Sequence, residues 1–176
     1  MNSENILWNA IEEFVELSDN AMLVKGTHMH EKHKSIIRWL NENTSNSKLL
    51  FVINAMQNIT RTEFIGLKKQ PKIGEAFRIG NNNYVFTTFN RVADEFEYYD
   101  FVIVYPIDRF VRERQTQVMN EINHKNYNKI FYVSCVDSIK YDFTVLDPYI
   151  QRTAYYDIEE DDPMAHKRIK ENWNNL

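Results

Sequence analysis

The chain has almost no cysteine and no long apolar run, and each of these features excludes a class of protein. The 176 residues include a single cysteine, Cys135, which excludes an internal disulfide framework and a zinc site built from cysteines. No apolar run approaches the roughly 18 residues that a membrane-spanning helix needs. The acidic, amphipathic start of the chain is unlike a signal peptide. We therefore expect a cytoplasmic protein without a membrane segment.

Positive charge is not in excess either. The net charge of -4 argues against strong non-specific binding to nucleic acid, although a local basic patch can still bind it. The chain is 43% hydrophobic and 14% aromatic, which is enough to bury a proper core. The length and the lack of a low-complexity linker predict one domain over residues 1–176. The richness in Asn, Lys, Ile and Tyr suggests an AT-rich genome, that of a bacterium or its phage.

Apolar runs and amphipathic stretches alternate along the chain. The runs that predict buried strands cover residues 20–26, 48–56, 99–107 and 128–136, and residues 74–89 have the pattern of a β-hairpin. The stretches that predict helices cover residues 3–17, 30–43 and 112–124. At the end of the chain, residues 157–176 contain an acidic loop and a last helix, with Asp162 as its cap.

This alternation predicts a three-layer α/β fold. Its sheet is expected to be mostly parallel, with helices on both faces and the hairpin as an insertion. The strand order could be P-loop/RecA-like or Rossmann-like. In such sheets ligands bind at the carboxyl ends of the strands, and the segment "KGTHMHEKHK", residues 25–34, falls there.

One hypothesis for this segment is a metal site. His28 and His30 form an H-x-H pair just after a strand, and in an extended segment their side chains point the same way. Asp108 follows a later strand and could supply a further ligand. Imidazole suits zinc, nickel, copper or iron, so this alternative predicts a divalent metal in a hydrolase or nuclease. A solvated, weakly basic turn explains the same residues.

A second hypothesis is a phosphate-binding loop, G-x-x-x-x-G-K-[ST] between strand and helix. Gly26 takes the position of the first glycine and Lys32 that of the lysine, but Glu31 replaces the second glycine. His33 replaces the hydroxyl residue that should hold magnesium. His33 also lies on the apolar stripe of its helix with Leu40, so core packing explains it equally. We expect a loop that no longer works, and therefore no cofactor.

A resemblance extends beyond this loop. Over residues 20–140 the order of segments resembles the first RecA-like domain of superfamily-two helicases and related restriction-enzyme motors. The sequence "NAMLVKGTHMHEKHKSIIRWLNE" is similar to the strand, P-loop and helix, and "KLLFVINAMQNI" is similar to the strand of motif Ia. Further along, "NNNYVFTTFNRV" resembles the next strand with its threonine, "YYDFVIVYPIDRF" the Walker B strand and "NKIFYVSCV" the strand that ends in S-A-T.

Carried over residue by residue, this resemblance implies lost catalysis. Tyr105 stands in place of the Walker B aspartate, and Pro106 in place of the glutamate that activates water. Ser134 matches the first residue of S-A-T, but Cys135 follows it. The family also needs a second RecA-like domain, for which we expect no room. The resemblance therefore implies neither a helicase nor a competent ATPase, while the strand pattern alone also arises in unrelated α/β sheets.

A basic stretch in and before the hairpin offers a third hypothesis. Lys68, Lys69, Lys72 and Arg78 could contact a nucleic-acid backbone, and Phe77 could stack on bases, although a solvated hairpin is the commoner outcome. Taken together, the patterns favour a non-catalytic interaction or regulatory protein encoded by a phage or mobile element. Its partner is expected to be a protein or a nucleic acid, and a homo-oligomer is compatible with the sequence.

Overall fold

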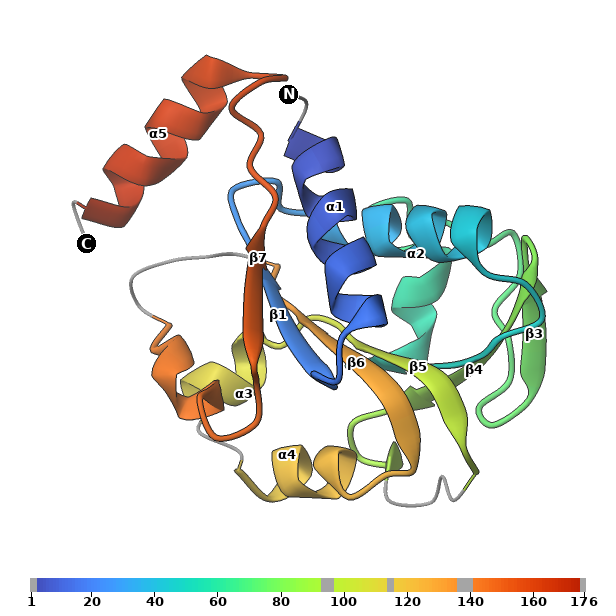
Figure 1. The fold of residues 1–176 in the computed structure, drawn as a ribbon. Coiled ribbons are helices and arrows are strands. Elements are labelled where there is room, and N and C mark those ends of the chain that lie inside the picture. Colours follow the sequence, from blue (N-terminus) through green and yellow to red (C-terminus); the bar gives the residue numbers. More distant parts are fainter. Residues whose placement is uncertain (1–2, 93–96, 114–115, 136–140, 175–176) are drawn as a thin grey trace.

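The computed structural model describes residues 3–92, 97–113, 116–135 and 141–174, which form one seven-stranded sheet covered by helices (Figure 1). The strands are β1 (Ala21–Lys25), β2 (Lys48–Ile53), β3 (Ala76–Ile79), β4 (Asn82–Thr88), β5 (Tyr99–Val104), β6 (Tyr127–Val133) and β7 (Arg152–Tyr155). The helices are α1 (Ser3–Glu16), α2 (Lys32–Asn43), α3 (Asp108–Glu113), α4 (Thr116–Asn123) and α5 (Pro163–Asn174), with short 3-10 helices η1 (Met56–Thr60) and η3 (Phe143–Leu146).

The strand order is β3-β4-β2-β5-β6-β1-β7, and every neighbouring pair is parallel except β3 and β4. The predicted α/β class, the mostly parallel sheet and the hairpin are confirmed. A Rossmann sheet has its first strand between the second and the fourth. Here β1 lies between β6 and β7, so the Rossmann-like alternative is wrong.

Both faces of the sheet are buried, which explains why its central strands read as continuous apolar runs. Helices α1 and α2 cover one face, and α3 and α4 lie on the other (Figure 1). Successive strand residues alternate between the two layers: Phe51 packs in the core beneath α1 and α2, whereas Leu50 and Val52 pack in the core on the side of α3 and α4.

The structure differs from the expected elements in two places. The helix predicted over residues 112–124 is confirmed as α4 over residues 116–123, and a further helix, α3, begins earlier, at Asp108. Helix α3 buries Phe110 and Val111 against the sheet. Strand β7 was not predicted, because its four residues at the edge of the sheet form no apolar run.

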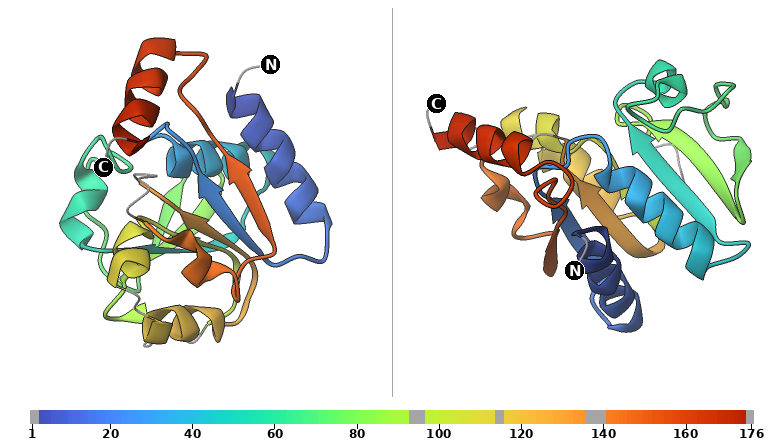
Figure 2. Two further views of the ribbon diagram at one scale, coloured as in Figure 1. Left: turned by 90° about the vertical axis from the view of Figure 1, so that its left-hand side faces the viewer. Right: turned by 90° about the horizontal axis from the view of Figure 1, so that it is seen from above.

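The C-terminal helix forms as expected. The carboxylate of Asp162 accepts a hydrogen bond from the Ala165 N–H at 2.8 Å, and Pro163 is the first helical residue. Helix α5 projects from the body of the molecule in both views of Figure 2, and most of its described side chains are exposed. His166 is the exception, at 5% exposure. Within the described residues no helix is both long and apolar enough to cross a membrane.

Candidate functional site

The carboxyl ends of three parallel strands meet at one edge of the sheet. Beyond the end of β6, the Ser134 N–H donates to the Val24 carbonyl of β1 at 3.0 Å. Beyond the end of β5, the Ile107 N–H donates to the Val133 carbonyl of β6, also at 3.0 Å. The loop of residues 26–31 follows β1 at the same edge, so the segments that resemble P-loop, Walker B and S-A-T motifs come together here.

Lys32 is the first residue of α2 and is fully buried. Its ammonium donates to the Gly26 carbonyl at 2.5 Å and to the Cys135 carbonyl at 3.4 Å. The lysine therefore turns back into the loop that precedes it and joins the end of β1 to the end of β6. Its role as a phosphate-binding residue stays a prediction.

Gly26 has a backbone conformation and a location that only glycine fits. Its φ is +124°, in the region that side chains rarely adopt, and a Cβ atom would lie 2.2 Å from the Tyr156 carbonyl oxygen. The first glycine of the loop is thus required by the close approach of the segment that follows β7.

His33 and Tyr105 stand where the resemblance places the two protein ligands of magnesium, and they stack on each other. Their ring centroids are 3.8 Å apart with an interplanar angle of 20°, and both residues are fully buried. Phe64 closes the group, with its ring centroid 5.4 Å from that of Tyr105. An aromatic stack therefore fills the space between α2 and the end of β5.

Both members of this stack are uncharged near neutral pH. Burial lowers the pKa of His33 to about 3, although its hydrogen bond with the Phe64 carbonyl opposes the shift. The carbonyl can only accept, so His33 Nε2, 2.6 Å away, carries the proton. His33 Nδ1 is then a bare acceptor, buried without a hydrogen-bond partner in the part of the chain that the structure describes. Burial also raises the pKa of the Tyr105 phenol far above its usual value.

The two histidines of the metal hypothesis point to different partners. His28 Nε2 lies 3.4 Å from an Asp161 carboxylate oxygen, and the His28 ring packs on Tyr156 with centroids 4.6 Å apart. Burial lowers the pKa of His28, against the opposing effects of Glu31 and Asp161.

His30 and Asp108 lie near Cys135. His30 Nδ1 is 3.8 Å from the Cys135 sulfur and 3.5 Å from the Tyr105 hydroxyl, while Asp108 accepts a hydrogen bond from the Cys135 N–H at 2.6 Å. Among the described residues no three His, Cys, Asp or Glu side chains are grouped as a metal site requires. The site formed by His28, His30 and Asp108 therefore gains no support from the geometry and stays a prediction.

Glu31, the residue that replaces the second glycine of the loop, directs its carboxylate along α2. It lies 2.8 Å from the Lys34 ammonium and 3.3 Å from the Arg38 guanidinium. Burial would raise the pKa of Glu31, but the hydrogen bonds and charges of Lys34 and Arg38 outweigh burial and lower it. The negative charge at the start of α2 therefore persists at neutral pH, which disfavours an anion there.

Sequence reasoning missed the residues that hold the loop from outside. Thr27 is buried and is hydrogen-bonded to Asp157 and His166, which lie 130 and 139 residues further along the chain. Asp157 belongs to the acidic stretch before α5 and His166 to α5 itself. No local pattern connects them to Thr27, because only the docking of the C-terminal segment beside β1 brings them together.

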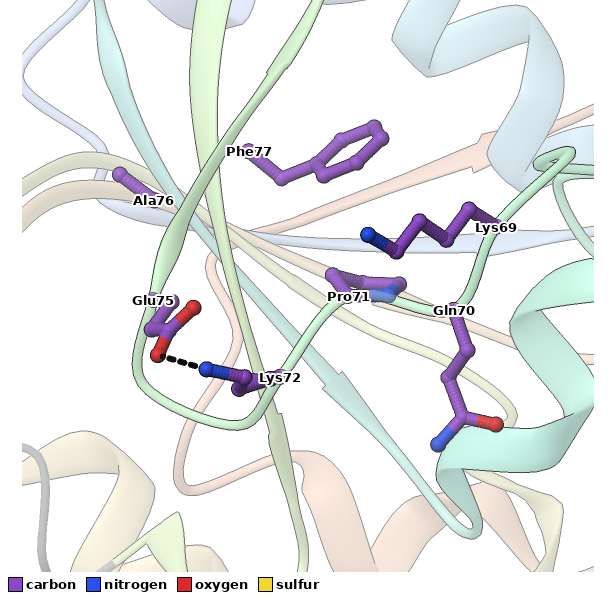
Figure 3. Close-up of a pocket in the computed structure, with 7 residues that line it drawn as sticks. All are labelled: Lys69, Gln70, Pro71, Lys72, Glu75, Ala76 and Phe77. Atoms are coloured by element: carbon purple, nitrogen blue, oxygen red, sulfur yellow. Dashed lines mark hydrogen bonds and ion pairs between the residues drawn. The ribbon is translucent and has the colours of Figure 1, made fainter.

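The basic stretch lines a separate hollow at the hairpin edge of the sheet. Lys69 and Lys72 border a cavity of about 220 Å³ together with Phe77 of β3 (Figure 3). The Lys72 ammonium is paired with the Glu75 carboxylate at 3.0 Å. Of the other predicted nucleic-acid contacts, Lys68 and Arg78 are exposed, and the Arg78 guanidinium is 3.4 Å from the Asn46 amide oxygen.

Comparison with known proteins identifies the fold. No protein-family model matches the chain, and no curated protein matches it in sequence. The large terminase of a thermophilic bacteriophage, in complex with ATP-gamma-S, has a TM-score of 0.59 and 10% identity, covering 98% of this chain and 48% of that chain. Another crystal form of this terminase has a TM-score of 0.57 and 11% identity. The match covers 98% of this chain and 49% of the terminase chain.

A second kind of protein shares the fold. The Sulfolobus solfataricus SWI2/SNF2 ATPase core in complex with dsDNA has a TM-score of 0.50 and 8% identity, covering 78% of this chain and 33% of that chain. The chain thus shares the RecA-like fold of these proteins, as the sequence resemblance predicted. It spans about half the length of the terminase it matches.

Replacing Gly26 with alanine should destabilise the protein more than the same change at another glycine with positive φ. We expect Gly26→Ala to lower the free energy of unfolding by about 3 kcal/mol or more, through backbone strain and overpacking against Tyr156. Gly66→Ala is the matched control, since φ is +72° there and the nearest atom to a Cβ is 3.6 Å away. That variant should lose only about 1 kcal/mol. Urea denaturation measures both, and equal losses would contradict the close approach of Tyr156.

The buried His33 should make stability depend on pH. Because its pKa is lowered from 6.5 to about 3 on folding, the unfolded chain binds the proton first, and stability falls as the pH drops below about 6.5. His33 should contribute a loss of about 2 kcal/mol between pH 7 and pH 5. The measurement is denaturation at both pH values for the native protein and for His33→Phe, which keeps an aromatic ring beside Tyr105. Equal losses in the two proteins would show that His33 does not titrate in this way.

Proposed function

We propose that this chain is a non-catalytic interaction or regulatory protein built on a RecA-like fold, encoded by a phage or a mobile element. The observation that carries the proposal is the stack of His33 on Tyr105, with ring centroids 3.8 Å apart. P-loop NTPases hold magnesium with a Ser or Thr after the lysine and with a Walker B aspartate. A neutral imidazole and a protonated phenol that pack on each other replace these two oxygen ligands.

The loop itself supports the same proposal. A phosphate loop works by turning free backbone N–H groups toward the anion. Here the Thr27 N–H donates to the Asp157 carboxylate at 2.8 Å and the His28 N–H to the Tyr156 carbonyl at 3.1 Å. The Glu31 carboxylate adds negative charge at the start of α2. The loop keeps Lys32 and Gly26, but two of its N–H groups are already bonded to the segment that follows β7. We therefore infer that the loop supports the fold and does not bind phosphate.

The similarity to a phage terminase and to an SWI2/SNF2 core suggests what such a domain could still do. The terminase was solved with ATP-gamma-S, and the SWI2/SNF2 ATPase core was solved with dsDNA. A domain that keeps this fold without magnesium chemistry can present the same kind of surface to a protein or nucleic-acid partner. Regulation by binding is therefore the function that the altered site favours.

The proposal predicts that the purified protein does not hydrolyse ATP. With magnesium present, phosphate release should equal that of the Lys32→Ala variant, because neither protein can hold the metal at the γ-phosphate. Magnesium should also add nothing to any effect of ATP on the melting temperature. A steady ATPase rate that disappears in Lys32→Ala, measured on matched preparations, would overturn the non-catalytic assignment.

A second candidate function is nucleic-acid binding at the hollow beside β3. Lys69 and Lys72 can contact phosphates there, and Phe77 offers a ring for stacking. The Lys72–Glu75 pair competes with such contacts. This candidate does not depend on the loop that follows β1.

If the hollow binds nucleic acid, the affinity for a single-stranded oligonucleotide should fall steeply with salt. The Lys69→Gln/Lys72→Gln variant should bind more weakly, and its slope of log affinity against log salt should be smaller by about 1.4. Fluorescence anisotropy at several salt concentrations measures this slope. Lys167→Gln, which removes an exposed lysine on α5, is the control and should bind like the native protein. Unchanged binding by the double variant would exclude this surface.

A further inference from the structure

The segment that follows β7 continues beside the loop that follows β1. The Tyr156 N–H donates to the Lys25 carbonyl at 2.8 Å, and the Tyr156 carbonyl accepts from the His28 N–H at 3.1 Å. These bonds extend the pairing of β1 and β7 past the ends of both strands. The same Tyr156 backbone leaves no space for a side chain at Gly26, so the two segments are in direct contact.

Asp157 anchors this contact. One of its carboxylate oxygens accepts from the Thr27 N–H at 2.8 Å and from the Thr27 hydroxyl at 3.0 Å. The Asp157 carbonyl also accepts from the Ser3 hydroxyl at 2.7 Å, which connects the segment to the start of α1. Hydrogen bonds to an ionised acceptor are the strong ones, so Asp157 contributes more to holding the loop than a neutral residue would.

His166 connects α5 to the same point. Its Nδ1 atom lies 2.8 Å from the Thr27 hydroxyl, and it is the buried residue of a helix whose other described side chains are half-buried or exposed. The Ile158 N–H donates to the same Thr27 hydroxyl at 3.1 Å. Asp157 and Ile158, from the acidic stretch, and His166, from α5, therefore all contact Thr27, the buried threonine of the loop.

We propose that residues 156–166 form an autoinhibitory strap, which holds the loop of residues 26–31 closed over Lys32. The strap fixes Thr27 and Gly26, and the Gly26 carbonyl in turn receives the Lys32 ammonium at 2.5 Å. Displacing the strap frees the loop and withdraws the Gly26 carbonyl, so that solvent reaches the Lys32 ammonium, while its hydrogen bond to the Cys135 carbonyl can remain. Because α5 stands away from the body of the molecule (Figure 2), a partner that captures α5 can act on the loop through His166.

The test is the rate at which an amine-reactive ester labels individual lysines of the full chain, read by mass spectrometry. Lys32 and Lys129 are the informative pair, since both are buried, at 0% and 3% exposure. Lys129 donates to the Phe14 carbonyl at the end of α1 and serves as an internal monitor of global unfolding. In the native protein both should be protected.

Asp157→Ala should raise the labelling rate of Lys32 by about tenfold or more, the factor that a loss of about 1.4 kcal/mol in local opening free energy produces. The rate at Lys129 should not change. His166→Ala, made on the exposed helix, should raise the Lys32 rate in the same selective way. Glu171→Gln is the control on α5, because Glu171 is exposed and lies 3.8 Å from the Lys167 ammonium, outside the strap, and its rates should equal those of the native protein.

Two results would overturn the proposal. One is a Lys32 that stays as protected as in the native protein in both Asp157→Ala and His166→Ala. The other is a parallel rise of Lys32 and Lys129 in both variants, which would mean that residues 156–166 only stabilise the fold as a whole. Neither result depends on whether the loop binds or hydrolyses a nucleotide.

Discussion

The burial of the Lys32 ammonium is the constraint on which the carboxyl edge of the sheet depends. A buried charge is costly unless it is hydrogen-bonded, and Lys32 reaches carbonyl oxygens at the ends of two strands, from Gly26 and Cys135. The Gly26 residue that supplies one of these carbonyls has a positive φ of +124°, a backbone conformation that glycine adopts without strain. That conformation in turn lies against the Tyr156 backbone, so helix α2, strands β1 and β6 and the C-terminal segment are mutually dependent.

The neighbouring position is occupied by His33 and Tyr105, which pack on each other near the end of β5. The parallel order of β5, β6 and β1 places residue 105 close to residue 33 whatever their side chains are. P-loop NTPases carry Ser or Thr and Asp at the corresponding positions and hold magnesium through them. With His33 and Tyr105 the same space is filled by stacked rings, at the expense of one buried imidazole nitrogen without a hydrogen-bond partner among the described residues.

How far the sequence predicts this structure depends on how local each signal is. The central strands were correctly predicted because burial on both faces requires continuous apolar runs, such as the one that contains Phe51. Strand β7 was missed because a short edge strand with Arg152 and Thr153 needs no apolar run. Helix α3 was not predicted as a separate element because it has six residues, too few to show a helical period, although its Phe110 and Val111 are buried in the core.

By itself, the sequence determined the α/β class and the resemblance to RecA-like domains, and it places His33 and Tyr105 where that resemblance expects Ser or Thr and Asp. These depend on residue identity and on periodicities within about 20 residues of chain, which are local properties. Tertiary structure alone decided that His33 stacks on Tyr105 and that Asp157 and His166 converge on Thr27. Those partners are 130 and 139 residues from Thr27, and only the parallel pairing of β7 beside β1 brings them to the loop.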